Sequence, residues 1–212
     1  MSEKLSAFGF DQDWVGPLCK MIQNVLHTDL GQNGHPFTLS QVGREHRLTE
    51  LGFYFPLNLV RPEDLNKMLE AHGVRSAQTG SIEAIKDLTF SPVRGMMRGF
   101  IDLVFTVRDR YFLIDWKTNF LGGQVKDYGP QALEEAMAKG RYVLQYLLYT
   151  VALHQYLKLR LPGYAYEKHF GGVYYLFVRG IDPRVGNRFG VFSDRPDARL
   201  IQHLSDRLID KP

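Results

Sequence analysis

Two aspartates and a lysine lie close together in an apolar part of the chain. Asp102 ends the run Gly-Phe-Ile-Asp, and thirteen residues later Asp115 and Lys117 flank a single tryptophan. Carboxylates can hold a divalent cation, and an ammonium group nearby can offset the negative charge on an attacked phosphate. These residue types at this spacing therefore indicate metal-dependent hydrolysis of a phosphodiester bond.

The pattern predicts that both acids belong to one β-hairpin. Strands are predicted over 97–107 and 110–117, with a tight turn between them. Because side chains alternate between the faces of a strand, Asp115 and Lys117 should project to the same side, about 7 Å apart. A register that places Asp102 beside Asp115 would bring two carboxylates within reach of one ion. Magnesium suits such a pair, because it keeps several waters and takes one or two protein carboxylates.

The surroundings of these acids favour a functional site over an ordinary strand edge. An Asp two residues before a Lys is a common pattern, and by itself it is typical of a solvated edge. Here Asp102 lies within Gly-Phe-Ile-Asp-Leu-Val-Phe, and Asp115 follows Tyr-Phe-Leu-Ile. An acid in such an apolar run is costly unless it is paired or bound to a metal.

A helix predicted over 130–158 adds a third component. Its residues Tyr142, Gln145, Tyr146 and Tyr149 recur at a spacing that forms one stripe. The stripe indicates a surface that faces the core, and Tyr146 and Tyr149 are interpreted in that way. Gln145 differs, because an amide in an apolar stripe needs hydrogen-bond partners. It could bond a metal-bound water or a DNA phosphate.

Helices are predicted on both sides of a run of strands, which favours an α/β fold with a mixed sheet. The remaining elements are helices over 12–27 and 196–208, a short helix from Pro62 to before Gly73, strands over 47–57 and 171–179, a loop over 74–92 and a glycine-containing connection over 119–128.

Composition limits the class of protein. The chain has 212 residues, of which 44% are hydrophobic and 23% charged, so one globular domain with a sizeable core is expected. No apolar run of about eighteen residues indicates a membrane span, and the N-terminus lacks a signal pattern. The single cysteine, Cys19, excludes a four-cysteine metal or iron–sulfur site within the chain and fits a reducing cytoplasm. A net charge of +3 permits nucleic-acid binding.

Together, these motifs resemble those of RecB-type nucleases in the PD-(D/E)xK superfamily. The segments 144–154 and 169–180 are also similar to the C-terminal nuclease domains of exodeoxyribonuclease V beta subunits. The likeness covers most of the chain and is strongest over 94–182. It implies a restriction-endonuclease-like fold, in which a mixed sheet core is flanked by helices.

The resemblance also implies roles for individual residues. Asp102, Asp115 and the main-chain carbonyl of Trp116 would hold Mg2+, Lys117 would be the catalytic lysine, and Gln145 would support the site. By the same resemblance, the domain would cut DNA strands unwound by a RecBCD-type helicase-nuclease during double-strand break repair, beside RecC-like and RecD-like subunits. Residues 1–212 are interpreted as a single nuclease domain.

The chain departs from the family pattern in two ways. It lacks the upstream Gly-x-x-x-His segment that usually supplies a metal-binding histidine, and the nearest upstream candidates are His27 and His46. It also lacks a G-x-x-x-x-G-K-S/T loop, so no ATP site is expected. Both features predict a fragment without the histidine-bearing helix and the helicase domains. Glu50 is a further candidate, with a supporting role.

Two interpretations therefore stay open. The first is a metal-dependent deoxyribonuclease, with Tyr142, Tyr146 and Tyr149 as possible supporting residues. The second is a catalytically impaired module that binds DNA or docks to another subunit, because the upstream histidine is absent. Intact acids at 102 and 115 favour the first. An iron–sulfur relative of the family is excluded by the single cysteine.

Overall fold

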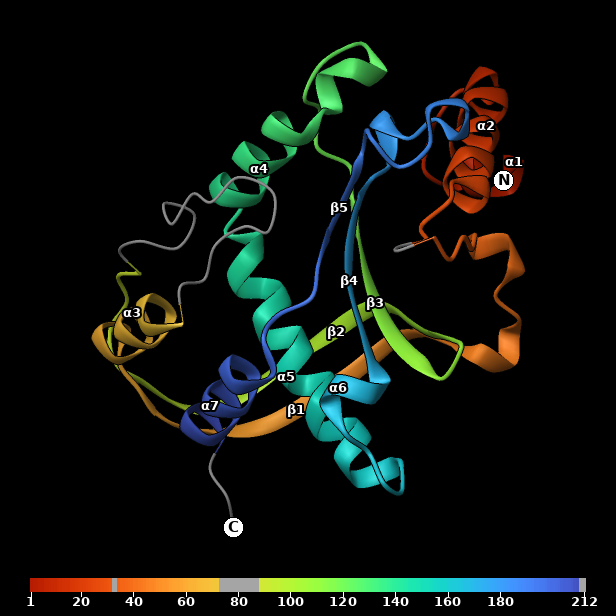
Figure 1. Ribbon diagram of the computed structural model, residues 1–212. Coiled ribbons are helices and arrows are strands. Elements are labelled where there is room, and N and C mark those ends of the chain that lie inside the picture. The colour runs from red at the N-terminus through yellow and green to blue at the C-terminus, as the bar shows by residue number, and fades with distance from the viewer. Residues whose placement is uncertain (32–33, 73–87, 210–212) are drawn as a thin grey trace.

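The computed structural model describes residues 1–31, 34–72 and 88–209, and its centre is a five-stranded mixed sheet (Figure 1). The strands lie in chain order across the sheet, as β1 (Arg47–Val60), β2 (Val93–Val107), β3 (Arg110–Lys117), β4 (Phe170–Phe177) and β5 (Val191–Asp194). Neighbouring strands are antiparallel except β3 and β4, which are parallel. The expected mixed α/β sheet with flanking helices is confirmed.

Helices cover both faces of the sheet. They are α1 (Ser2–Ala7), α2 (Val15–His27), α3 (Pro62–Ala71), α4 (Pro130–Lys139), α5 (Tyr142–Arg160), α6 (Tyr166–His169) and α7 (Ala198–Leu208). One core cluster joins α3, α4, α5 and α7 to one face, and a second joins α2 and residues 30–42 to the other. Figure 1 shows α2 and α5 on opposite sides of the strands. We call these faces the α5 face and the α2 face.

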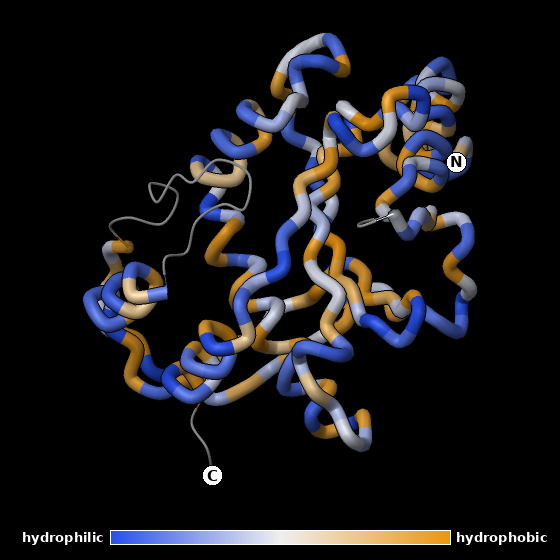
Figure 2. Tube along the Cα trace, viewed as in Figure 1, coloured by the Kyte–Doolittle hydropathy of each residue, from blue (hydrophilic) through white to orange (hydrophobic). Residues whose placement is uncertain are grey.

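The strands form where apolar residues dominate. All eight residues of β4 are buried, because its sequence is apolar throughout and helices cover both of its faces. Figure 2 shows that the central strands carry hydrophobic stretches, whereas the peripheral turns are largely hydrophilic. No helix in the described part of the chain has the length and apolar content that crossing a bilayer requires.

The helix predicted over 130–158 is two helices, and this prediction was wrong. α4 ends at Lys139 and α5 begins at Tyr142. Arg141 between them has φ 52°, a left-handed conformation that no α-helix continues through. A Cβ on Gly140 would lie 2.5 Å from the Tyr142 ring, so a larger residue at position 140 would require this ring to move. The break sets the start of α5 beside the sheet.

Other boundaries differ by small amounts, and some elements were not predicted. The last helix begins at Ala198 and not at 196, because the Asp197 side chain caps it by accepting the N–H groups of Arg199 and Leu200. Neither α1, α6 nor β5 was expected. Most of the loop predicted over 74–92 lies outside the described residues.

Part-way along β1 and β2, the alternation of side chains between the two faces of the sheet is interrupted. Leu51 pairs with Ile101, which leaves Glu50 opposite Asp102. Leu103 packs on the α2 face, but Ile101, two residues away, packs on the α5 face. Strict alternation would put both on one face, so the ladder is irregular at Asp102. Glu50 has φ 52°, which provides the local irregularity on β1.

Candidate active site

The two predicted acids lie where β2 and β3 separate. The ladder between these strands ends at the pair Leu103 and Ile114. Immediately beyond that pair, an Asp102 carboxylate oxygen accepts the backbone N–H of Trp116 at 2.9 Å, in place of a strand-to-strand bond. Asp115 is the next residue outward on β3. The hairpin therefore places both acids at the same opening in the sheet.

Asp115 is buried and forms an ion pair with Lys117. The Lys117 Nζ lies 2.7 Å from Asp115 Oδ2, and the two side chains are only 10% and 6% exposed. Burial raises the pKa of Asp115, and the negative charge of Asp102 raises it further, whereas the bond to Lys117 lowers it. Asp115 thus experiences the charge of Asp102 as well as that of Lys117.

The Lys117 ammonium group is held on several sides. It donates to Gln145 Oε1 at 3.0 Å and lies 3.6 Å from the centre of the Tyr142 ring and 4.9 Å from that of Tyr175. Aromatic faces attract a cation electrostatically. The ammonium position is therefore defined by a carboxylate, an amide and two rings.

Both the oxygen and the nitrogen of the Gln145 amide form hydrogen bonds. Its Oε1 also accepts the hydroxyl of Tyr175 at 3.1 Å, and its Nε2 donates to the Tyr149 hydroxyl at 3.0 Å. The expectation that this amide needs partners is met by Lys117 and two tyrosines. Sequence reasoning missed Tyr175, although a tyrosine within a wholly buried strand signals a hydroxyl that needs a partner.

The tyrosines of the stripe differ in how deeply they are buried. Tyr146 is buried, and its hydroxyl donates to Asp194 Oδ2 at 2.7 Å, on β5. Tyr149 packs against the core, and the centres of the Tyr149 and Phe53 rings are 5.7 Å apart in an edge-to-face arrangement. The core interpretation of both residues is confirmed. Tyr142 lies against the Lys117 ammonium.

The three other candidate residues, His27, His46 and Glu50, lie in different parts of the structure. The His27 ring bonds the carbonyl of Gln23 at 2.8 Å in the last turn of α2, and His46 lies in the exposed turn before β1. Neither has a contact with Asp102 or Asp115 among the described hydrogen bonds and ion pairs. Glu50 is exposed and lies opposite Asp102 in the strand register.

The atoms at the opening that are proposed to bind a metal ion are oxygens. Among the residues that the structure describes, no three His, Cys, Asp or Glu side chains gather as a metal site. Two carboxylates are available, from Asp102 and Asp115. The N–H and C=O groups of one strand residue point towards the same neighbouring strand. Because the Trp116 N–H points towards Asp102, the Trp116 carbonyl points to that side as well. Such a set fits Mg2+, which completes its shell with water.

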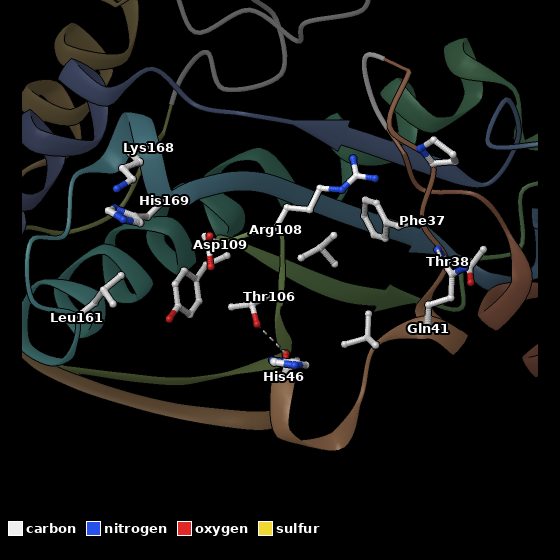
Figure 3. A pocket seen from close by; sticks show the side chains of 14 residues that line it. Phe37, Thr38, Gln41, His46, Thr106, Arg108, Asp109, Leu161, Lys168 and His169 are labelled. Carbon is white, nitrogen blue, oxygen red and sulfur yellow. Dashed lines mark hydrogen bonds between the residues drawn. The ribbon is translucent and has the colours of Figure 1, made fainter.

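A pocket of about 760 Å3 lies at the other end of the hairpin (Figure 3). Arg108 and Asp109 of the turn line it, together with Lys168, His169 and His46. It is roughly 20 Å along β3 from the acids. No predicted catalytic residue lines it among the described residues, so the candidate chemistry lies at the opening between β2 and β3.

Several known proteins are similar to this chain. It is 41% identical over 206 residues to the RecBCD enzyme subunit RecB of Escherichia coli K12, an alignment that covers 96% of this chain and 17% of that protein. It is 37% identical over 195 residues to RecB of Haemophilus influenzae Rd, and 38% over 213 residues to RecB of Mycobacterium tuberculosis H37Rv. No protein-family model matches the sequence.

The chain is homologous to part of RecB. The resemblance indicated by the motifs is thereby confirmed. The chain spans about one sixth of the length of the RecB relatives, 15% to 19% in the three named here. The alignment with the E. coli RecB covers nearly the whole chain, so it includes the hairpin and α5. A segment of this size and fold fits a C-terminal nuclease domain of RecB.

Proposed function

We propose that this chain is a metal-dependent nuclease domain that hydrolyses phosphodiester bonds of DNA. The observation that carries the proposal is the buried pair of Asp115 and Lys117 beside Asp102, at the opening between β2 and β3. Burying ionised groups is costly, and such groups gather where their chemistry is needed. Homology to RecB, a subunit of an enzyme, supports the same conclusion.

The proposed metal is Mg2+, with Asp102, Asp115 and the Trp116 carbonyl as its protein ligands. When bound, the ion would polarise the phosphate and lower the pKa of a coordinated water. Burial is the main cause of the raised pKa of Asp115, and the charge of Asp102 adds to it. A bound cation would offset the repulsion between these two carboxylates. Glu50 lies opposite Asp102 and is proposed to support the site from β1.

Lys117 is proposed as the catalytic lysine. Its ammonium is fixed by Asp115, Gln145 and the Tyr142 ring, so it needs little reorganisation during the reaction. From this position it can orient the attacking water and offset the charge that develops on the phosphate. Gln145 acts through Lys117, because it holds the ammonium and does not itself need to touch the substrate.

The larger assembly is also part of the proposal. By homology to RecB, residues 1–212 would work as one nuclease domain on strands unwound by a RecBCD-type enzyme in the cytoplasm, with RecC-like and RecD-like subunits as partners. The chain would then contribute to double-strand break repair.

The test is Mg2+-dependent digestion of end-labelled DNA by this chain and by Asp115→Asn. We expect cleavage by the wild type, its loss in EDTA, and at least a hundredfold loss in Asp115→Asn, the scale seen when one charge-stabilising group is removed. Asp109→Asn is the matched control. It changes the other end of the same hairpin, and Asn tolerates the left-handed φ of 61° there.

The competing interpretation predicts a different result. If the chain is a DNA-binding or subunit-docking module, the wild type and Asp115→Asn will be equally inert while oligonucleotide binding persists. Equal cleavage by both would instead indicate a contaminating nuclease and would contradict the assignment of Asp115.

A further inference from the structure

Two histidine side chains from different helices meet where α3 lies beside α7 (Figure 1). His72 is the C-cap residue of α3, and His203 lies in the middle of α7. The His72 Nε2 atom lies 2.8 Å from the His203 Nδ1 atom, and the ring centres are 4.9 Å apart. His203 is exposed and His72 is half-buried. The fold therefore brings two imidazole nitrogens to one solvent-accessible point.

The two helices also have a polar link that does not involve the histidines. Arg207, one turn after His203 on α7, forms an ion pair with Asp64 of α3. This pairing offsets the positive charge of Arg207 close to the two rings. At an accessible position, water competes for the hydrogen bond between the imidazoles, so this bond contributes little by itself. The meeting of the two rings is therefore open to a further role.

The spacing of the two nitrogens is close to that of two histidines on one transition-metal ion. Zn–N bonds of about 2.0–2.1 Å place two ligand nitrogens roughly 3.3 Å apart at a tetrahedral angle and about 2.9 Å apart at a right angle. The observed separation is 2.8 Å. A neutral imidazole can carry its proton on either nitrogen, so both rings can direct a lone pair to the same ion without becoming charged. Small rotations of two accessible rings complete the arrangement.

The chemistry of the ligands selects the ion. Neutral imidazole suits Zn2+, Cu2+ and Ni2+, whereas Mg2+ prefers oxygen ligands. In the part of the chain that the structure describes, no group of three or more His, Cys, Asp or Glu side chains could hold a metal. Water would therefore complete the coordination of an ion held by His72 and His203. This pair differs in kind from the oxygen ligands proposed at Asp102 and Asp115.

We propose that His72 and His203 bind one divalent transition-metal ion of the Zn2+ type, and that the ion fastens α3 to α7. In sequence α3 lies between β1 and β2, so the ion would anchor the helix that connects these two strands. The inference goes beyond the proposed nuclease function and does not depend on it.

The test measures Zn2+ binding by titration calorimetry in excess Mg2+, which occupies the proposed oxygen site. We expect one Zn2+ per chain. Loss of a supporting residue around a metal already weakens binding 10- to 100-fold, so His72→Gln and His203→Gln should each weaken it at least tenfold. His46→Gln, which changes a histidine in the exposed turn before β1, should leave the affinity unchanged. Asp64→Asn keeps both imidazoles and breaks the other link between the helices, so its effect should be much smaller.

A second measurement follows the stability of the fold. Because a ligand of the folded state stabilises it, Zn2+ should raise the melting temperature of the wild type and of His46→Gln, but not that of His203→Gln. Equal Zn2+ affinity in the wild type and both histidine variants would overturn the site. An equally large loss in Asp64→Asn would also overturn it, because helix packing and not imidazole would then determine binding.

The outcomes also separate this inference from the proposed function. Zn2+ binding that is lost in Asp115→Asn and kept in His203→Gln would place the ion at the acids and reject the histidine site. Mg2+-dependent cleavage should be the same in His203→Gln and the wild type. Zn2+ binding that depends on both histidines supports the inference even if the chain never cleaves DNA.

Discussion

At the scale of single residues, the candidate site depends on how Lys117 is surrounded. Its ammonium is bound by Asp115 and Gln145 and faces the Tyr142 ring. Gln145 in turn is fixed by Tyr175 and Tyr149. Gln145 therefore helps to set the position of the proposed catalytic lysine.

Replacing Gln145 by leucine should affect both stability and activity. Lys117 and Tyr175 would each lose an acceptor in a buried setting, so the free energy of unfolding should fall by about 1–3 kcal/mol. Cleavage should fall as well, because Lys117 loses a fixed partner. Tyr149→Phe removes one bond at a half-buried ring and should cost only about 1 kcal/mol. Urea denaturation and cleavage assays check both, and an equal effect of the two variants would contradict the scheme.

His154 should make stability depend on acid. Burial lowers its pKa to about 4, and the charge of Lys158 contributes. In the unfolded chain the pKa is near its ordinary value of 6.5. Between these values the unfolded state binds more protons, so the free energy of unfolding should be highest above pH 6.5 and decline as the pH falls to about 4.

The His154→Asn variant isolates this contribution. Urea denaturation of both proteins at several pH values should give a flatter dependence for the variant between pH 6.5 and 4. Parallel curves for the two proteins would show that His154 does not titrate as its burial requires.

At the scale of elements, the exchange of faces in β1 and β2 places the site. Glu50 takes a left-handed conformation opposite Asp102. Beyond this point Phe53 and Phe55 pack towards α5, while Tyr54 and Phe100 lie on the opposite surface and are exposed. The irregularity therefore lies between the part of the ribbon that carries Asp102 and the outer part that packs against α5.

Substitutions at Glu50 should reveal the cost of this conformation. A left-handed non-glycine residue costs roughly 1–2 kcal/mol, and glycine recovers part of it despite its greater unfolded entropy. Glu50→Gly should therefore raise the free energy of unfolding by up to about 1 kcal/mol, and Glu50→Val should lower it by at least as much. Thermal or urea unfolding measures both. The opposite order would mean that the side chain, and not the backbone, determines stability at this position.

The sequence predicted these elements unevenly, for physical reasons. Alternating apolar residues mark one face of β1, and the run from Tyr111 to Trp116 marks β3, so both were found. The break at Arg141 was not, because apolar spacing continues across it and does not indicate the left-handed backbone at Arg141 or the contact of the Tyr142 ring with Gly140. β5 has four residues, too few for a periodic signal.

The site was predictable to a similar degree. Apolar neighbours singled out Asp102 and Asp115, and the stripe singled out Gln145. The contacts of Tyr175 with Lys117 and Gln145 join β4 to β3 and α5, and no local pattern encodes them. The exchange of faces was also invisible, because Leu51 to Leu57 alternates regularly by itself.

At the scale of the whole molecule, α5 connects the site to the rest of the fold. Gln145 contacts β3, Tyr146 bonds Asp194 on β5, and Gln155 bonds Ser205 on α7. Burial raises the pKa of Asp194, and the Tyr146 hydroxyl opposes this rise. Changes at the site should therefore be felt in global stability.

Binding of Mg2+ should stabilise the whole chain. A ligand that binds only the folded state raises the free energy of unfolding by about 2.7 kcal/mol at a hundred times its dissociation constant. The melting temperature of the wild type and of Asp109→Asn should rise with Mg2+ relative to Na+ at equal ionic strength. Asp115→Asn should show no such rise. A rise of equal size in all three would place the metal elsewhere.

The buried pair of Asp115 and Lys117 also restricts how this chain can change over generations. Removing one member leaves an uncompensated buried charge, at a cost of about 3–5 kcal/mol, whereas exchanging both for apolar residues is often neutral. A lineage released from selection for activity would therefore pass through an unstable intermediate if it lost either residue first. The two positions should be inherited, or replaced, as a unit.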